Sequence, residues 1–114
     1  MNNKRKGTFF EKEFVKLLGS NGYWAHRMAE AEDGSQPFDV IAVKDKIAYA
    51  YDCKTCDAKT FSISRLEENQ ILAFEKWLSC KNTEPMIAIK TKNGHIILVG
   101  YQELKEKGRI KLYE

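Results

Sequence analysis

The chain has 114 residues, of which 43% are hydrophobic and 31% are charged, and its formal net charge is +3. This length supports one hydrophobic core, so we expect residues 1–114 to form a single domain. There is no run of eighteen apolar residues, and no apolar core follows the basic N-terminal residues, which argues against a membrane span or an export signal and favours a cytoplasmic protein.

The first half of the chain predicts one helix followed by three strands. Residues 8–21 carry apolar side chains at helical spacing and end in a segment containing glycines. Residues 23–28 predict a short strand, and the polar segment 29–37, which contains glycine and proline, predicts a loop. Residues 38–43 and 46–54 predict two more strands, and their short connection requires an antiparallel hairpin.

A second helix is expected from residue 65 to residue 80. Ser64 and Glu67 form the pattern of a capping box, in which two side chains satisfy free amides at a helix start. Gln70 lies on the apolar stripe of this helix, so we expect a polar amide on its inward face. The apolar members of the stripe include Leu66, Ala73, Phe74, Trp77 and Leu78.

The remaining segments complete an α/β (α+β) pattern. Residues 85–90 and 95–100 predict a hairpin, and the tail predicts a short helix at 102–106 and a strand at 109–114. The order of elements predicts a central mixed β-sheet flanked by helices. The sequence has neither a βαβαβ order nor a glycine-rich phosphate loop, so we expect no nucleotide cofactor.

The three cysteines are an odd number in a chain without an export signal, which favours reduced thiols. Cys53 and Cys56 have the spacing of zinc ligands, but no second close pair of Cys or His completes a set of four. Cys53 alternates with its neighbours on the predicted strand, so its side chain is expected to pack in the core.

Charge is distributed unevenly along the chain. Residues 1–27 carry a net charge of +4, residues 28–57 carry −4 and residues 58–114 carry +3. This arrangement is only weak support for a polyanionic partner, unless the central acids converge on a metal ion.

The acids of the predicted hairpin can share one end of the sheet. Asp52 and Lys54 are two residues apart and project from the same face of a strand. Asp39 lies near the start of the neighbouring antiparallel strand, so the two carboxylates are expected to be adjacent. Adjacent carboxylates repel each other unless a cation lies between them, and hard oxygen ligands suit Mg²⁺, or Mn²⁺ as a substitute.

These residues resemble the motif of the PD-(D/E)XK nucleases. The motif corresponds to "PFD" at residues 37–39 and "DCK" at residues 52–54. Over residues 6–100 the chain is most similar to the archaeal and phage Holliday junction resolvases, with Glu11 at the position of the family's first-helix glutamate. It departs from the pattern by one residue between Pro37 and Asp39, and by an acid-rich loop at 29–36.

The resemblance implies a restriction-endonuclease-like core and metal-dependent cleavage of branched DNA. Asp39 and Asp52 would bind the metal, together with the carbonyl of Cys53 and with Glu11, which would bind directly or through water. Lys54 would orient or deprotonate the attacking water, or neutralise the charge that grows on the phosphorane. Catalytic roles are thus expected for Glu11, Asp39, Asp52, Lys54 and Gln70.

Structural roles are alternatives for each of these residues. Asp39 could cap a turn, and Asp52 with Lys54 could form an ion pair worth under about 1 kcal/mol. Glu11 could be a solvated helix residue, and Gln70 could bond to a loop amide in the first helical turn.

The basic N-terminal residues and the loop are candidates for DNA contacts, although the N-terminal ones could equally form a solvated tail. The candidates are Lys4, Arg5, Lys6, Arg27, Ser35 and Gln36.

A homodimer is expected, because two cuts on opposing strands require two sites and the chain supplies one. The two helices carry more large aromatic side chains than the core of one thin sandwich should need, namely Phe9, Phe10, Phe74 and Trp77. Part of this surface should therefore form the interface between the copies. The alternatives are a nuclease of other specificity, restriction-like or specific for single strands, and a DNA-binding module without turnover.

Overall fold

The computed structural model describes residues 3–29, 31–33 and 35–113, with side chains from residue 6 onward. The helices are α1 (Asn3–Ser20), α2 (Glu68–Ser79) and α3 (Tyr101–Lys107), with a 3-10 turn, η1 (Ile63–Arg65). The strands are β1 (Trp24–Arg27), β2 (Val40–Lys44), β3 (Ile47–Cys56), β4 (Thr60–Ser62), β5 (Met86–Thr91), β6 (Ile96–Gly100) and β7 (Arg109–Lys111).

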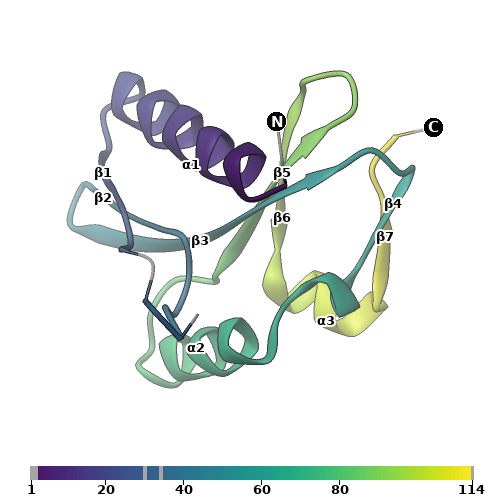
Figure 1. Cartoon of the computed structure of the whole chain (residues 1–114). Helices are drawn as coiled ribbons and strands as arrows, with labels where there is room; N and C mark the ends of the chain where they lie inside the picture. Colours follow the sequence, from purple (N-terminus) through teal and green to yellow (C-terminus); the bar gives the residue numbers. More distant parts are fainter. Residues whose placement is uncertain (1–2, 30, 34, 114) are drawn as a thin grey trace.

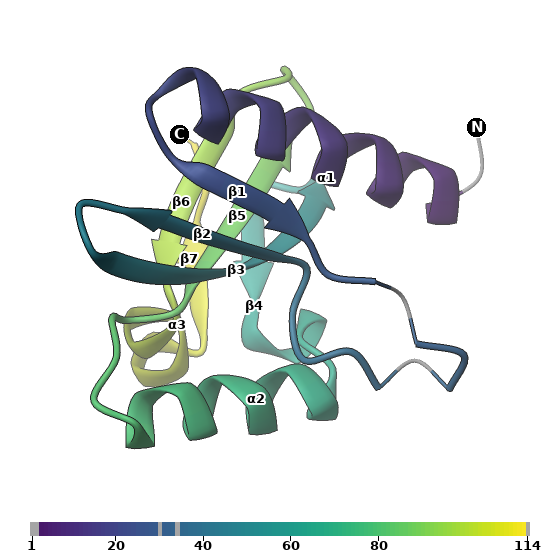
Figure 2. The same cartoon turned by 90° about the vertical axis from the view of Figure 1, so that its left-hand side faces the viewer.

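Five of these strands form a mixed sheet in the order β1-β2-β3-β5-β6. β3 and β5 are parallel, and the other pairs in this sheet are antiparallel. Figures 1 and 2 show α1 on one face of the sheet, and α2 and α3 on the other. The expected mixed sheet flanked by helices is therefore confirmed.

The two faces of the sheet bury two separate apolar clusters. The cluster under α1 contains Phe10, Phe14 and Tyr51, and the rings of Phe14 and Tyr51 meet edge to face at 5.0 Å. The cluster toward α2 contains Phe74 and a larger set of aliphatic side chains. β3 runs between both clusters, and its residues alternate between them as the pleat requires.

The start of α2 differs from the expectation. Ser64 lies in η1 and Leu66 is extended, so the helix begins at Glu68 and not at residue 65. Glu67 is the N-cap, and its capping box is formed with Gln70. The capping box predicted for Ser64 and Glu67 was thus wrong by three residues. Leu66 is buried in the core with an extended backbone, so the helix can begin only after it.

Two further differences concern α1 and the tail. α1 begins at Asn3, five residues earlier than expected. β7 is shorter than the predicted strand and pairs with β4, a three-residue strand that was not predicted. The sequence of β4, Thr-Phe-Ser, is too short to show an alternating pattern.

Of the four aromatic residues expected to exceed the needs of the core, one is largely exposed in the structure. Phe10 and Phe74 are buried in the two clusters, and Trp77 is half-buried and donates its Nε1 proton to the Thr83 carbonyl oxygen at 2.8 Å. Phe9 is 60% exposed. Among the helices in the described part of the chain, none is long and apolar enough to span a membrane.

Candidate active site

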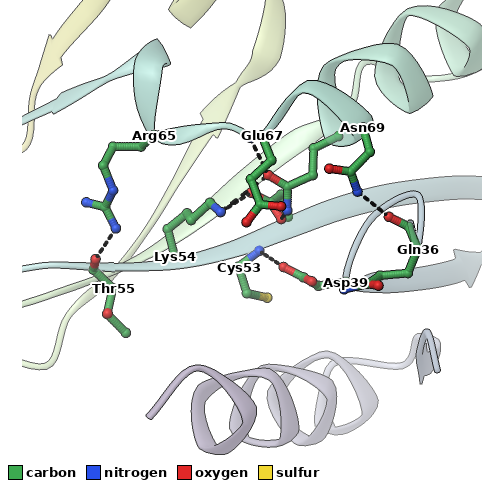
Figure 3. A network of polar contacts seen from close by, with 10 residues as sticks. Gln36, Asp39, Cys53, Lys54, Thr55, Arg65, Glu67 and Asn69 are labelled. Carbon is green, nitrogen blue, oxygen red and sulfur yellow. Dashed lines mark hydrogen bonds and ion pairs between the residues drawn. The ribbon is translucent and has the colours of Figure 1, made fainter. Parts of the chain in front are cut away.

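Asp39 is held against β3 where the chain enters β2. Its backbone N–H donates to the Tyr51 carbonyl oxygen at 3.0 Å, and its side-chain Oδ2 accepts the Cys53 N–H at 2.8 Å (Figure 3). The antiparallel pairing of β2 with β3 begins at Val40 and Tyr51, one residue after Asp39 and one residue before Asp52, and the Asp39 carboxylate is close enough to raise the pKa of Asp52. The two carboxylates are therefore neighbours at one end of the hairpin.

Asp52 and Lys54 project from β3 toward the first turn of α2. Asp52 is fully buried, and its Oδ1 accepts a hydrogen bond from Gln70 Nε2 at 2.7 Å. Lys54 Nζ lies 3.5 Å from Asp52 Oδ2 and donates to Gln70 Oε1 at 3.3 Å. The amide of Gln70 therefore bridges the carboxylate and the ammonium group.

Gln70 is itself fixed by its position in the helix. Its Oε1 also accepts the backbone N–H of Glu67 at 2.9 Å, which forms one half of the capping box. Because this bond orients the amide, the Nε2 protons face Asp52. The alternative that Gln70 only bonds to a backbone amide is thus half correct, since one side chain makes both contacts.

The charge of Asp52 is poorly compensated. Burial raises the pKa of Asp52 well above 3.8, the neighbouring Asp39 carboxylate raises it further, and Lys54 opposes both effects. Among the described residues, its Oδ2 is the one buried side-chain polar atom without a hydrogen-bond partner. A cation at this oxygen would compensate the charge, so the pair of carboxylates fits a hard divalent metal ion.

Glu11 lies near these acids but points to Arg27. The Arg27 Nε atom is 3.3 Å from Glu11 Oε1, and both residues line a small cavity of about 20 Å³ with Asp39 and Gln36. Within the described residues, no three His, Cys, Asp or Glu side chains are close enough to surround one ion. Glu11 is therefore adjacent to Asp39, without forming a closed set of three ligands with the two aspartates.

Of the candidates for DNA contacts, Lys6 is exposed at the edge of the site. Ser35 closes a turn by donating its N–H to Asp33 Oδ1, and Gln36 binds within its own loop and to α2. The side chains of Lys4 and Arg5 lie outside the described residues.

A polar cleft of about 560 Å³ opens in front of Lys54 and is called here the catalytic cleft. It contains residues that the sequence reasoning did not select, notably Arg65 and Glu67. Arg65 donates to the Thr55 carbonyl oxygen at 3.0 Å, and Asn69 Nδ2 donates to the Gln36 carbonyl oxygen at 2.9 Å (Figure 3). Arg65 and Glu67 lie just before the first turn of α2, and Asn69 lies within it beside Gln70. This proximity to Gln70 in the sequence is a signal that could have identified them as site residues. The cleft is lined by Lys6, Gly7, Lys54, Thr55, Arg65 and Glu67, among others.

Cys53 and Cys56 lie on opposite faces of β3. Cys53 packs in the cluster under α1, and Cys56 packs in the cluster toward α2. Their sulfur atoms therefore cannot bind the same ion, whatever their spacing in the sequence. Burial raises the pKa of the Cys53 thiol, and the Asp39, Asp52 and Glu11 carboxylates add to this effect, so the thiol stays protonated.

The model of the archaeal Holliday junction resolvase (Hjc) family matches residues 2–113. The chain belongs to this family. It is thus a Holliday junction resolvase, an endonuclease of DNA recombination, and the family inferred from the motif is confirmed. The phage part of that resemblance receives no support, because the matched family and the two similar proteins below are archaeal.

Two proteins illustrate how similar this resolvase is to its relatives. The crossover junction endodeoxyribonuclease Hjc of Methanocaldococcus jannaschii is 30% identical over 105 residues, which are 92% of this chain and 73% of that protein. The crystal structure of Hjc, a Holliday junction resolvase of Archaeoglobus fulgidus, superposes with a TM-score of 0.73 at 21% identity, over 93% of this chain and 88% of that one. The structural similarity supports the fold.

Proposed function

We propose that the chain hydrolyses phosphodiester bonds at four-way DNA junctions with Mg²⁺ as the cofactor and Mn²⁺ as a possible substitute. The observation that carries the proposal is Asp52 Oδ2, a buried oxygen without a hydrogen bond, beside a second carboxylate. Asp39 and Asp52 would hold the ion, the carbonyl of Cys53 would add a ligand, and Glu11 would reach it through water. When bound, such an ion neutralises phosphate charge and lowers the pKa of a water molecule.

The protein's own groups would position the scissile phosphate and the water. Lys54 is a fixed cation at the inner end of the catalytic cleft, where it can stabilise the negative charge that grows on the phosphate in the transition state. Gln70 would act as a positioning residue, since it bonds to both Asp52 and Lys54. These contacts make Lys54 part of the same network as the carboxylates that are proposed to bind the metal ion.

We further propose that residues 1–114 form one catalytic domain and that two copies act as a homodimer. A junction is resolved by two cuts in opposing strands, and each chain has one such site, so a two-fold axis supplies the second.

The test compares cleavage of a four-way junction, a flap, a duplex and a single strand of equal length, with Mg²⁺, Mn²⁺ or EDTA. We expect paired cuts in the junction, little cleavage of the other substrates, and loss of all cleavage in EDTA. Equal cleavage of duplex or single-stranded DNA would instead support a nuclease of other specificity. Binding without cleavage in either metal would indicate a DNA-binding module.

A further inference from the structure

A second groove lies beside the catalytic cleft and is lined by residues of the N-terminal half of α1 and of the β5–β6 hairpin. This hairpin groove has a volume of about 450 Å³. Lys6, Thr55 and Asp57 line both cavities, so the groove continues directly from the cleft in front of Lys54. Its other walls include Phe9, Lys90 and Lys92.

The charges in the hairpin groove are predominantly positive. Lys6 and Lys92 are exposed, and Lys90 donates to Glu13 Oε1 at 2.6 Å, which offsets part of its charge. Asp57 is the acid among the residues that line the groove. A polyanion entering from the catalytic cleft would thus be attracted by two exposed ammonium groups and repelled by one carboxylate.

The groove also has an apolar side. Phe9 is 60% exposed at its rim, while the next residue, Phe10, is buried beneath it, with Lys90 Nζ 6.0 Å from the centre of its ring. An exposed aromatic ring between lysines is the combination that proteins use for nucleic acid strands, in which bases or sugars contact the ring and phosphates contact the cations. An acidic peptide would also match the charges. It would not explain why the groove continues from the cleft in front of Lys54, whereas a DNA substrate bound in that cleft would.

We propose that the hairpin groove binds the DNA strand adjacent to the scissile phosphate, with backbone phosphates at Lys6 and Lys92 and a sugar or base against Phe9. This inference rests on the proposed function, because it requires the scissile phosphate in the catalytic cleft. It assigns a DNA-binding role to the β5–β6 hairpin, which contains none of the residues expected to contact DNA from the sequence.

The test measures junction binding in EDTA at several salt concentrations for Lys92→Ala and Phe9→Ala. Lys76→Ala is the matched control, because Lys76 is exposed in the last turn of α2. We expect Lys92→Ala to weaken binding several-fold and to reduce the slope of log K against log salt by about 0.9. Phe9→Ala should weaken binding with an unchanged slope, and Lys76→Ala should leave both quantities unchanged.

Asp57→Asn provides a test in the opposite direction. Removal of the one carboxylate should tighten binding several-fold, which damage to the fold would not do. Wild-type affinity and slope in both Lys92→Ala and Asp57→Asn would overturn the groove assignment. If the proposed function were wrong, the wild-type protein itself would fail to cleave junctions, so the two failures are distinguishable.

Discussion

At the scale of single residues, Asp52 combines a structural cost with the proposed metal site. Burial raises the pKa of Asp52 in the folded protein above 3.8, its ordinary value in the unfolded chain. At pH values between the unfolded and the folded pKa, the unfolded chain therefore binds fewer protons than the folded chain. The free energy of unfolding therefore falls as pH rises through this interval, and above it the folded protein carries the full cost of the buried charge. Such a cost is typical of functional groups.

Asp52→Asn should abolish cleavage, because it removes a proposed metal ligand and little volume. In EDTA at pH 7 the variant should melt several degrees above the wild type, and its melting temperature should fall less as pH rises above about 4. Thermal melts over a pH series, with and without Mg²⁺, measure this. A less stable variant at pH 7 would show that the Lys54 ion pair outweighs the desolvation of Asp52, and retained turnover in Mg²⁺ would contradict the metal assignment.

Lys54→Ala should lower the cleavage rate by several orders of magnitude with little loss of junction affinity. The reason is that its proposed contribution is made to the transition state and not to the bound ground state. Single-turnover rates and binding curves separate the two effects. An equal fall in affinity and rate would make Lys54 a phosphate contact only.

The sequence was sufficient to place these residues because they depend on strand periodicity. Asp52 and Lys54 share a face, and the short β2–β3 connection brings the Asp39 and Asp52 carboxylates to the same end of the hairpin. The contact between Glu11 and Arg27 was not predictable, since it depends on the packing of α1 over β1. Side-chain pairs between elements that are distant in sequence leave no periodic signal.

At the scale of elements, α1 contains two glycines that differ in their surroundings. Gly7 lines the catalytic cleft, Gly19 lies in the last turn, and an added Cβ at either would meet no atom within 4 Å. Gly7 thus leaves a bare stretch of helix where DNA is proposed to approach.

Gly7→Ala and Gly19→Ala should each stabilise the protein by about 0.5–1 kcal/mol, because alanine loses less backbone entropy in a helix. Only Gly7→Ala should weaken junction binding, since its methyl group narrows the cleft. Urea unfolding and binding titrations measure both effects. Unchanged affinity in Gly7→Ala would show that DNA does not approach this turn of α1.

The start of α2 illustrates where element boundaries escape sequence reasoning. Ser64 and Glu67, and Glu67 and Gln70, are both spaced as N-cap and N3 residues. The structure uses the second pair, because Leu66 is buried and the backbone is extended there. The choice between the pairs is therefore made by tertiary packing, and it also orients Gln70 toward Asp52.

At the scale of the whole molecule, the expected homodimer has a functional test. Mixed dimers of wild-type protein and Asp52→Asn should have one active site, so they should nick one strand of a junction without completing resolution. Light scattering measures the mass, and cleavage of a supercoiled cruciform plasmid distinguishes nicked from linear product. A strict monomer, or linear product from mixed dimers as efficient as from wild type, would contradict paired action of two sites.

The surface of the proposed homodimer contact was less accessible from the sequence than the fold. A count of aromatic residues cannot separate Phe10 and Phe74, which fill the two clusters, from Phe9, which is exposed. The fold depends on patterns within segments, whereas an interface depends on which side chains remain after the core has been filled.

The side chains of β3 alternate between the two apolar clusters, so catalytic activity depends on the correct pairing register of this strand. Asp52 faces α2 while Cys53 packs under α1, so a shift in pairing by one residue would exchange them. The slipped strand would bury a carboxylate among aromatic rings and present a thiol to the substrate. A molecule with this shifted pairing would be inactive, so the specific activity of a preparation should be proportional to its correctly folded fraction.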